Sequence, residues 1–127
     1  MPATAPALPP RSITIDHTKP VTVNITSQSI HVCRYKTWRR PDAATAWVDC
    51  GTGTTEDTIV DTHDIGVMPA GSSMVYWLGL GGPPKSKFKV NIIFIQDGKV
   101  LNGGVISEEG DADAKGAAVA ERKVVFP

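Results

Sequence analysis

Short strand-like segments separated by turn residues run through nearly the whole chain, and this pattern restricts the fold more than any other feature. No amphipathic helical period continues for about ten residues or more. About nine short strands with frequent turns predict an all-β protein, an antiparallel β-sandwich of the jelly-roll or immunoglobulin-like type. The predicted strands cover residues 12–16, 21–26, 29–38, 45–50, 58–62, 72–80, 87–96, 99–107 and 117–126.

Residues 1–11 differ from the rest because prolines recur there between small residues. This composition favours an extended, polyproline-like conformation and offers no core of its own. We therefore predict an extended arm over residues 1–11 and a single sandwich domain over residues 12–127. The arm is either a tail or a strap that docks on a neighbouring subunit. The chain has 127 residues, which is enough to bury a conventional core without metals or disulfides.

Charge and hydropathy restrict the partners and the location. Thirteen basic residues balance thirteen acidic ones, so the chain has no overall positive field to attract nucleic acid. No segment approaches the ~20 apolar residues that a membrane span needs. Prolines interrupt the N-terminus, where a secretory signal would have a continuous apolar stretch. We expect a soluble, cytoplasmic protein that neither binds nucleic acid nor spans a membrane.

One hairpin is predicted at Asp97-Gly98, because this dipeptide tolerates the positive φ values of a type I′ turn. Every second residue from Phe88 to Phe94 then faces the core. The partly apolar character of the other face predicts that this strand is central in its sheet or covered on both sides. The predicted pairs are Ile95 with Val100 and Phe94 with Leu101.

A second hairpin is predicted about Pro41-Asp42, which supplies turn residues between two strands. The predicted pairs are Cys33 with Cys50, Arg34 with Asp49, Tyr35 with Val48, and Lys36 with Trp47. The inner face would carry Cys33, Tyr35, Ala46, Val48 and Cys50. The outer face would carry Arg34, Lys36, Trp38, Trp47 and Asp49.

That outer face is the candidate ligand-binding site. Aromatic rings stack on the apolar faces of sugars, and neighbouring charged side chains hydrogen-bond hydroxyl groups. The alternative is that another strand or subunit covers both tryptophans while the charged groups stay at its edge. The two interpretations differ in whether Trp38 and Trp47 are exposed.

The cysteines and histidines suggest a third class of function. Cys33 and Cys50 are predicted to form a disulfide under oxidising conditions and to stay buried thiols in the cytoplasm. His31 lies two residues from Cys33 on one strand face and could act as its base. Asp61 and His63 share a face and could offer two metal ligands. No spacing matches a structural zinc signature, and we predict no cofactor and no catalytic residue.

The acidic segment 108–113 gathers carboxylates around a glycine, as calcium sites do. It resembles the calcium loop before the last strand in bacterial fucose-binding lectins of the calcium-dependent β-sandwich type, with Asp111 and Asp113 matching two ligands. Lys115 and Gly116 stand where that family continues with amide and carboxylate ligands. The favoured interpretation is a solvated acidic loop between two strands.

Three hypotheses follow. The first is a non-catalytic interaction or assembly protein, a homo-oligomer in which the proline arm and the aromatic, charged face make the contact. The second is a lectin-like carbohydrate-binding protein that uses Trp38, Trp47, Arg34, Lys36 and Asp49. The third is a metal-binding protein or enzyme that uses His31, Cys33, Asp61 and His63.

Overall fold

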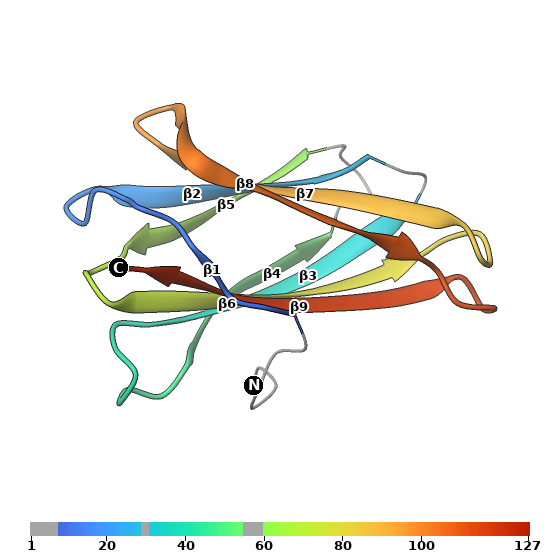
Figure 1. The fold of residues 1–127 in the computed structure, drawn as a ribbon, viewed down its shortest axis with the longest axis horizontal. Coiled ribbons are helices and arrows are strands. Elements are labelled where there is room, and N and C mark those ends of the chain that lie inside the picture. The colour runs from blue at the N-terminus through green and yellow to red at the C-terminus, as the bar shows by residue number, and fades with distance from the viewer. Residues whose placement is uncertain (1–7, 29–30, 55–59) are drawn as a thin grey trace.

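Two β-sheets face each other in the computed structural model, which describes residues 8–28, 31–54 and 60–127 (Figure 1). Within these residues nine strands are found, and they account for every regular element. None of the described residues forms a helix that could cross a membrane. The strands are β1 (Arg11–Ser12), β2 (Pro20–Ser27), β3 (Val32–Arg40), β4 (Val48–Thr54), β5 (Val60–Val67), β6 (Ser72–Gly81), β7 (Lys87–Gln96), β8 (Lys99–Asp111) and β9 (Ala117–Phe126).

The strand order confirms the predicted β-sandwich. One sheet has the order β1-β9-β6-β3-β4 and the other has the order β5-β2-β7-β8. Neighbouring strands are antiparallel except for the short parallel pair β1–β9. Only β3–β4 and β7–β8 are hairpins between neighbours in one sheet, and every other connection crosses to the opposite sheet.

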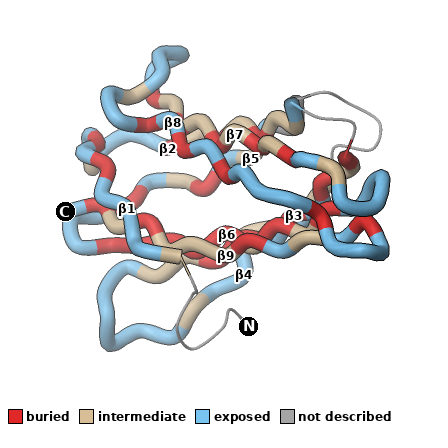
Figure 2. Tube along the Cα trace, turned by 45° about the vertical axis from the view of Figure 1, so that its right-hand side comes forward, coloured by how far each residue is buried: buried red, intermediate tan, exposed pale blue. Residues whose placement is uncertain are grey.

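The core fills the space between the sheets and follows the alternation of each strand (Figure 2). In β7 the side chains of Phe88, Val90, Ile92 and Phe94 are buried, and the residues between them are half-buried. This strand lies between β2 and β8, so the predictions of its core face and its central position are confirmed. Alternate burial is what a two-layer sandwich requires of a central strand.

The turn of the β7–β8 hairpin has the predicted geometry. Asp97 has a φ of 52° and Gly98 a φ of 71°, which are the positive values of a type I′ turn. Ile95 lies opposite Val100, as predicted. The turn chemistry therefore fixes the first pairs of the hairpin.

The next predicted pair of this hairpin, Phe94 with Leu101, is wrong. The ladder resumes only where Ile93 lies opposite Val105, so residues 101–104 form a bulge in β8. A Cβ atom at Gly104 would lie 2.8 Å from the carbonyl oxygen of Leu101. The bulge therefore favours glycine at position 104, and alternation alone does not predict it.

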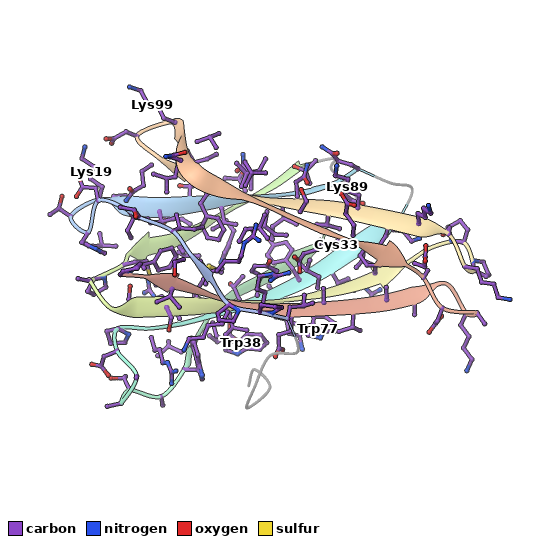
Figure 3. All side chains as sticks on the ribbon, in the orientation of Figure 1. Lys19, Cys33, Trp38, Trp77, Lys89 and Lys99 are labelled. Atoms are coloured by element: carbon purple, nitrogen blue, oxygen red, sulfur yellow. The ribbon has the colours of Figure 1, made fainter. Side chains whose placement is uncertain are left out.

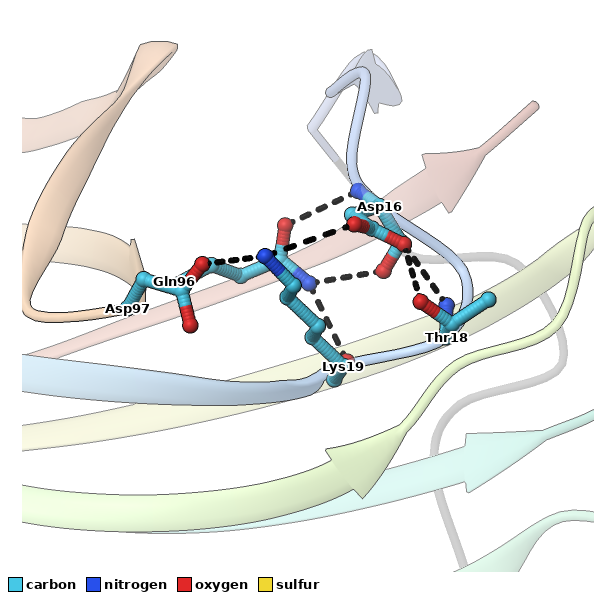
Figure 4. Close-up of polar contacts among 5 residues, drawn as sticks. All are labelled: Asp16, Thr18, Lys19, Gln96 and Asp97. Carbon is cyan, nitrogen blue, oxygen red and sulfur yellow. Dashed lines mark hydrogen bonds and ion pairs between the residues drawn. The ribbon is translucent and has the colours of Figure 1, made fainter.

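A buried glutamine fixes the turn before β2 to the end of β7 (Figure 4). The Gln96 side chain is 7% exposed and accepts a hydrogen bond from the backbone N–H of Asp16. Its amide group donates to the carbonyl oxygens of Asp16 and Lys19. The Lys19 ammonium group also pairs with Asp97 across this cluster. Gln96 thus satisfies backbone groups that no strand ladder satisfies.

The N-terminal segment lies on the protein's own sandwich where it is described. The predicted strand 12–16 is shorter than expected, because pairing with β9 is limited to β1 and the chain then crosses between the sheets. The Leu8 side chain packs against the core, and the Pro9 carbonyl accepts a hydrogen bond from the Arg122 guanidinium. The remainder of the predicted arm, residues 1–7, lies outside the described residues.

Candidate ligand-binding site

The β3–β4 hairpin forms, but β4 is displaced along β3 from the predicted register. Arg34 lies opposite Thr54 and Lys36 lies opposite Thr52. The four predicted pairs, Cys33–Cys50, Arg34–Asp49, Tyr35–Val48 and Lys36–Trp47, are therefore wrong. The inner face was also predicted incorrectly at Ala46 and Val48, which are exposed.

Two local features set the observed register. The Asp42 carboxylate accepts hydrogen bonds from the backbone N–H groups of Ala44 and Thr45 and from the Thr45 hydroxyl. Such a side-chain cap stabilises a turn, so the chain forms an extended loop before β4 begins. A β-bulge between Thr37 and Trp38 shifts the pairing again. The loop is the long excursion below the five-stranded sheet in Figure 1.

The predicted alternation along β3 is confirmed even though the register is not. Cys33 and Tyr35 are buried against the other sheet, whereas Arg34 and Lys36 are exposed on the outer face of the five-stranded sheet. Trp38 lies on the same outer face but is only 7% exposed. Its ring is therefore not a free stacking surface.

Trp47 and Asp49 lie apart from Arg34 and Lys36. Trp47 belongs to the loop before β4, is half-buried, and has the Arg40 guanidinium 4.1 Å from its ring centroid. Asp49 is exposed and accepts a hydrogen bond from the backbone N–H of Gly51. The five predicted site residues thus do not form one cluster.

A different tryptophan, Trp77 of β6, lies beside Arg34 and Lys36. Lys36 is the direct cross-strand neighbour of Trp77, and its ammonium nitrogen is 5.8 Å from the ring centroid. Arg34 is the cross-strand neighbour of Gly79, two residues further along β6. Figure 3 shows Trp77 and Trp38 on the side of their sheet that faces away from the other sheet. The outer face therefore has a partly exposed aromatic ring with two cations beside it on the neighbouring strand.

The position of the Trp77 ring depends on the absence of a side chain at Gly79. A Cβ atom at residue 79 would lie 2.5 Å from Cη2 of the indole. The six-membered end of the indole therefore extends over Gly79, along the strand. A tryptophan two residues before a glycine in one strand is the sequence signal for this arrangement, because residues i and i+2 share a face.

Two shallow grooves flank Trp77. One has a volume of about 390 Å³ and the other about 530 Å³. Arg34 and Trp77 line both grooves, so these two side chains lie where the grooves adjoin. The first groove is also lined by Val32, Gly79, Leu80, Gly81, Ala117, Ala118 and Val119, and the second by Tyr35, Lys36, Thr52, Gly53 and Thr54.

The residues of the catalytic and metal hypothesis are dispersed. His31 is 3% exposed and its Nε2 atom lies 2.8 Å from the Ser86 hydroxyl, beside Phe88. Cys33 is buried in the core, and burial raises the pKa of its thiol to about 12. A thiol in that environment is protonated and is a poor nucleophile.

His63 lies near Cys50 instead of Cys33. The Thr37 hydroxyl lies 3.1 Å from Nε2 of His63 and accepts a hydrogen bond from the Cys50 thiol at 3.2 Å. Cys33 and Cys50 are not joined by a disulfide. The Asp61 side chain lies outside the described part of the structure. Among the described residues, no group of three or more His, Cys, Asp or Glu side chains is close enough together to hold a metal ion.

The acidic segment is a strand for most of its length. β8 continues to Asp111, and Glu108 points inward, where it pairs with Arg122. Glu109 pairs with Lys89 on the outer face, and Asp113 accepts hydrogen bonds from backbone N–H groups of the next turn. The prediction of a solvated loop is therefore wrong at Glu108, because the inward half of a strand cannot be solvated.

Comparison with protein-family models, curated proteins and solved structures finds no match to this chain. The candidate site therefore depends on its own geometry. It consists of Trp77, Gly79, Arg34 and Lys36 with the two flanking grooves, and we call it the Trp77 face.

Proposed function

We propose that this chain is a non-catalytic binding protein, and that its ligand is a carbohydrate bound on the Trp77 face. The observation that carries the proposal is the indole of Trp77, half-buried and extended over Gly79 between two grooves. An aromatic ring held along a sheet supports stacking on the apolar face of a pyranose ring.

The polar groups around Trp77 suit hydroxyl groups better than a large apolar partner. Arg34 and Lys36 supply hydrogen-bond donors on one side of the ring, and Thr52 supplies a hydroxyl in the same groove. Val119 is 66% exposed in the other groove and offers a small apolar contact. A saccharide presents this combination of apolar ring faces and hydroxyl edges.

A glycan array followed by titration calorimetry with the strongest glycan tests the proposal. Trp77→Ala should weaken binding at least about tenfold, since a central tryptophan carries much of the binding energy of such surfaces. Gly79→Val should weaken it similarly, because the new side chain displaces the indole. Trp47→Ala is the matched control, since Trp47 lies in a loop away from this face, and it should bind as the wild type does.

Circular dichroism and the unfolding midpoint of each variant show that the sandwich is intact. Absence of binding to any glycan would refute the carbohydrate class. Retained affinity in both Trp77→Ala and Gly79→Val would refute the Trp77 face as the site.

Self-association is a second candidate, and it is supported by the outer face of the four-stranded sheet. Val100 and Val105 are 56% and 47% exposed there, opposite the half-buried Ile95 and Ile93. These four side chains form an apolar area on an otherwise polar face, and such areas often mark contacts between proteins.

The mass of the protein in solution tests this candidate. Under it, the wild type has the mass of an oligomer by light scattering, and Val105→Asp has the mass of a monomer. Val119→Asp changes a more exposed valine on the other sheet and should keep the oligomer. Removal of residues 1–7 tests the contribution of the arm separately. A monomeric wild type excludes this candidate.

A further inference from the structure

A pocket with two arginines in its wall lies at the end of β3 that is remote from Arg34. Its volume is about 310 Å³. Apolar side chains form the rest of the wall, and two of them, Val48 and Val67, are 53% and 50% exposed. The lining residues are Arg39, Arg40, Pro41, Val48, Val67, Met68 and Pro69.

Arg39 is held in place by the opposite sheet. Its Nη1 atom donates a hydrogen bond to the carbonyl oxygen of Ile65 in β5. The guanidinium occupies the space that a side chain at Gly66 would fill. The charge of Arg39 is therefore fixed at the mouth of the sandwich, where β3 and β5 approach each other.

The Arg40 guanidinium is held against Trp47, but one of its buried donors lacks a hydrogen-bond partner among the described residues. Its guanidinium carbon lies 4.1 Å from the ring centroid of Trp47, and its Nη1 atom makes one long contact, 3.4 Å, with the Ala43 carbonyl oxygen. Its Nε atom is buried and has no hydrogen-bond partner among the described residues. A buried donor without a partner is costly, so this group is expected to gain from a bound acceptor.

Neither guanidinium forms an ion pair in the part of the chain that the structure describes. The ion pairs found there involve Lys19, Lys89 and Arg122, and none involves Arg39 or Arg40. The Asp42 carboxylate interacts with the charge of Arg40, but it is hydrogen-bonded to the Thr45 hydroxyl and to backbone N–H groups of its own turn. Two arginines that line one otherwise apolar pocket are complementary to an anion with an apolar body. The guanidinium fork is matched in geometry to a carboxylate.

We propose that this pocket binds a small organic acid that has one carboxylate and a short aliphatic body. The carboxylate accepts hydrogen bonds from Arg40, with Arg39 contributing its charge, and the aliphatic body contacts Val48 and Val67. The site is separate from the Trp77 face and does not depend on the function proposed for it.

Binding of hexanoate to the full chain, measured by calorimetry and by ligand-observed NMR, tests the proposal. We expect a Kd of about 1 mM for so small a ligand. Hexanol and acetate are the control ligands, because hexanol keeps the aliphatic body without the carboxylate and acetate keeps the carboxylate with little aliphatic body. Both should bind at least about tenfold more weakly than hexanoate. Trp77→Ala should leave hexanoate binding unchanged.

Two variants test whether hexanoate binds in this pocket. Arg40→Gln should weaken hexanoate binding about tenfold or more, the scale of a lost charge-assisted hydrogen bond. Val67→Asp should weaken hexanoate binding by a similar factor, because it places a negative charge in the pocket wall. Val67→Asn introduces an uncharged side chain of the same size as aspartate, and its affinity for hexanoate should stay within about threefold of the wild type. Lys99→Gln removes a distant exposed cation and should have no effect.

Equal binding of hexanol and hexanoate would overturn the proposal, as would unchanged hexanoate binding in either Arg40→Gln or Val67→Asp. No detectable binding at a hexanoate concentration of about 10 mM would overturn it as well.

Discussion

The Arg122 guanidinium meets the Glu108 carboxylate between the two sheets, with Nη2 and Oε1 2.8 Å apart. The two side chains are 12% and 2% exposed, and Nε of Arg122 donates a second hydrogen bond to the same oxygen. Tyr76, the cross-strand neighbour of Arg122, lies against this pair, and burial raises the pKa of its hydroxyl. The pair joins β9 of one sheet to β8 of the other.

Breaking this pair from one side should be strongly destabilising. Arg122→Met leaves the Glu108 charge buried without its partner, and we expect a loss of about 3–5 kcal/mol in the free energy of unfolding by urea titration. The double variant Arg122→Met/Glu108→Leu should recover most of that loss, because no buried charge remains. Lys89→Met, which breaks an exposed pair with Glu109, should cost less than about 1 kcal/mol. Equal losses in the single and double variants would contradict the expectation.

Gln96 should be more important for stability than the exposed ion pair next to it. Gln96→Leu removes three hydrogen bonds to backbone groups of Asp16 and Lys19, and the Asp16 carbonyl keeps a long one, 3.4 Å, from the Lys19 backbone N–H. The expected loss is on the order of 2 kcal/mol in the free energy of unfolding. Lys19→Gln removes only exposed ion pairs, with Asp97 and with Asp16, and should cost much less than Gln96→Leu. A larger loss in Lys19→Gln than in Gln96→Leu would contradict this.

The two thiols should react at different rates in the folded protein. Cys33 is buried with a pKa raised to about 12, whereas Cys50 is half-buried and hydrogen-bonded to Thr37. With iodoacetamide at pH 8, mass spectrometry should find the first adduct on Cys50 and an adduct on Cys33 only when denaturant is added. Cys50→Ala should therefore show almost no labelling under native conditions. Rapid native labelling of Cys33 would show that the core opens.

The buried Cys33 thiol should make the free energy of unfolding depend on pH in the alkaline range. Because the folded state raises the pKa of Cys33, the unfolded chain loses this proton first, at its ordinary value near 9. The contribution of the protonated Cys33 thiol to the free energy of unfolding is therefore fully present below about pH 9 and is lost as the pH rises toward 12. Cys33→Val should reduce the slope of unfolding free energy against pH in this range. An unchanged slope would assign the alkaline effect to other groups such as Tyr76.

Acid should destabilise the fold by protonating carboxylates that accept hydrogen bonds in turns. The pKa of Asp113 is lowered below 3.8, mainly by the hydrogen bond from the Ala117 backbone N–H, with a further one from Lys115. Because the pKa of Asp113 is lower in the folded state than in the unfolded chain, its contribution to the free energy of unfolding is present above about pH 4 and is lost as the pH falls below that value. Thermal unfolding followed from pH 6 to pH 2 should show a smaller decrease for Asp113→Asn than for the wild type.

Local patterns were sufficient to predict most of the strands. The bounds of β7 and β9 match the predicted ranges 87–96 and 117–126. In β7 the alternation of the sequence is followed by the burial of every second residue. The turn at Asp97-Gly98 was also predictable, since few residues tolerate its backbone geometry.

The register and the site depended on interactions that the alternation does not contain. The Asp42 cap and the bulge at Thr37 together displaced β4, so Trp47 falls in the loop and Asp49 lies opposite Trp38 instead of Arg34. Trp77 was assigned to a strand but not to the site, because its position beside Lys36 depends on which strands are neighbours. Strand order is a property of the whole fold and was not encoded in either segment alone.

The crossing connections between the sheets have a consequence for folding kinetics. Only the β3–β4 and β7–β8 hairpins can pair by closing a short loop, and the remaining strands meet partners that are distant in the chain. Folding rates fall as contacting residues become more separated in sequence. We expect neither sheet to form alone and refolding to occur over milliseconds to seconds, with the two hairpins as the earliest ordered units.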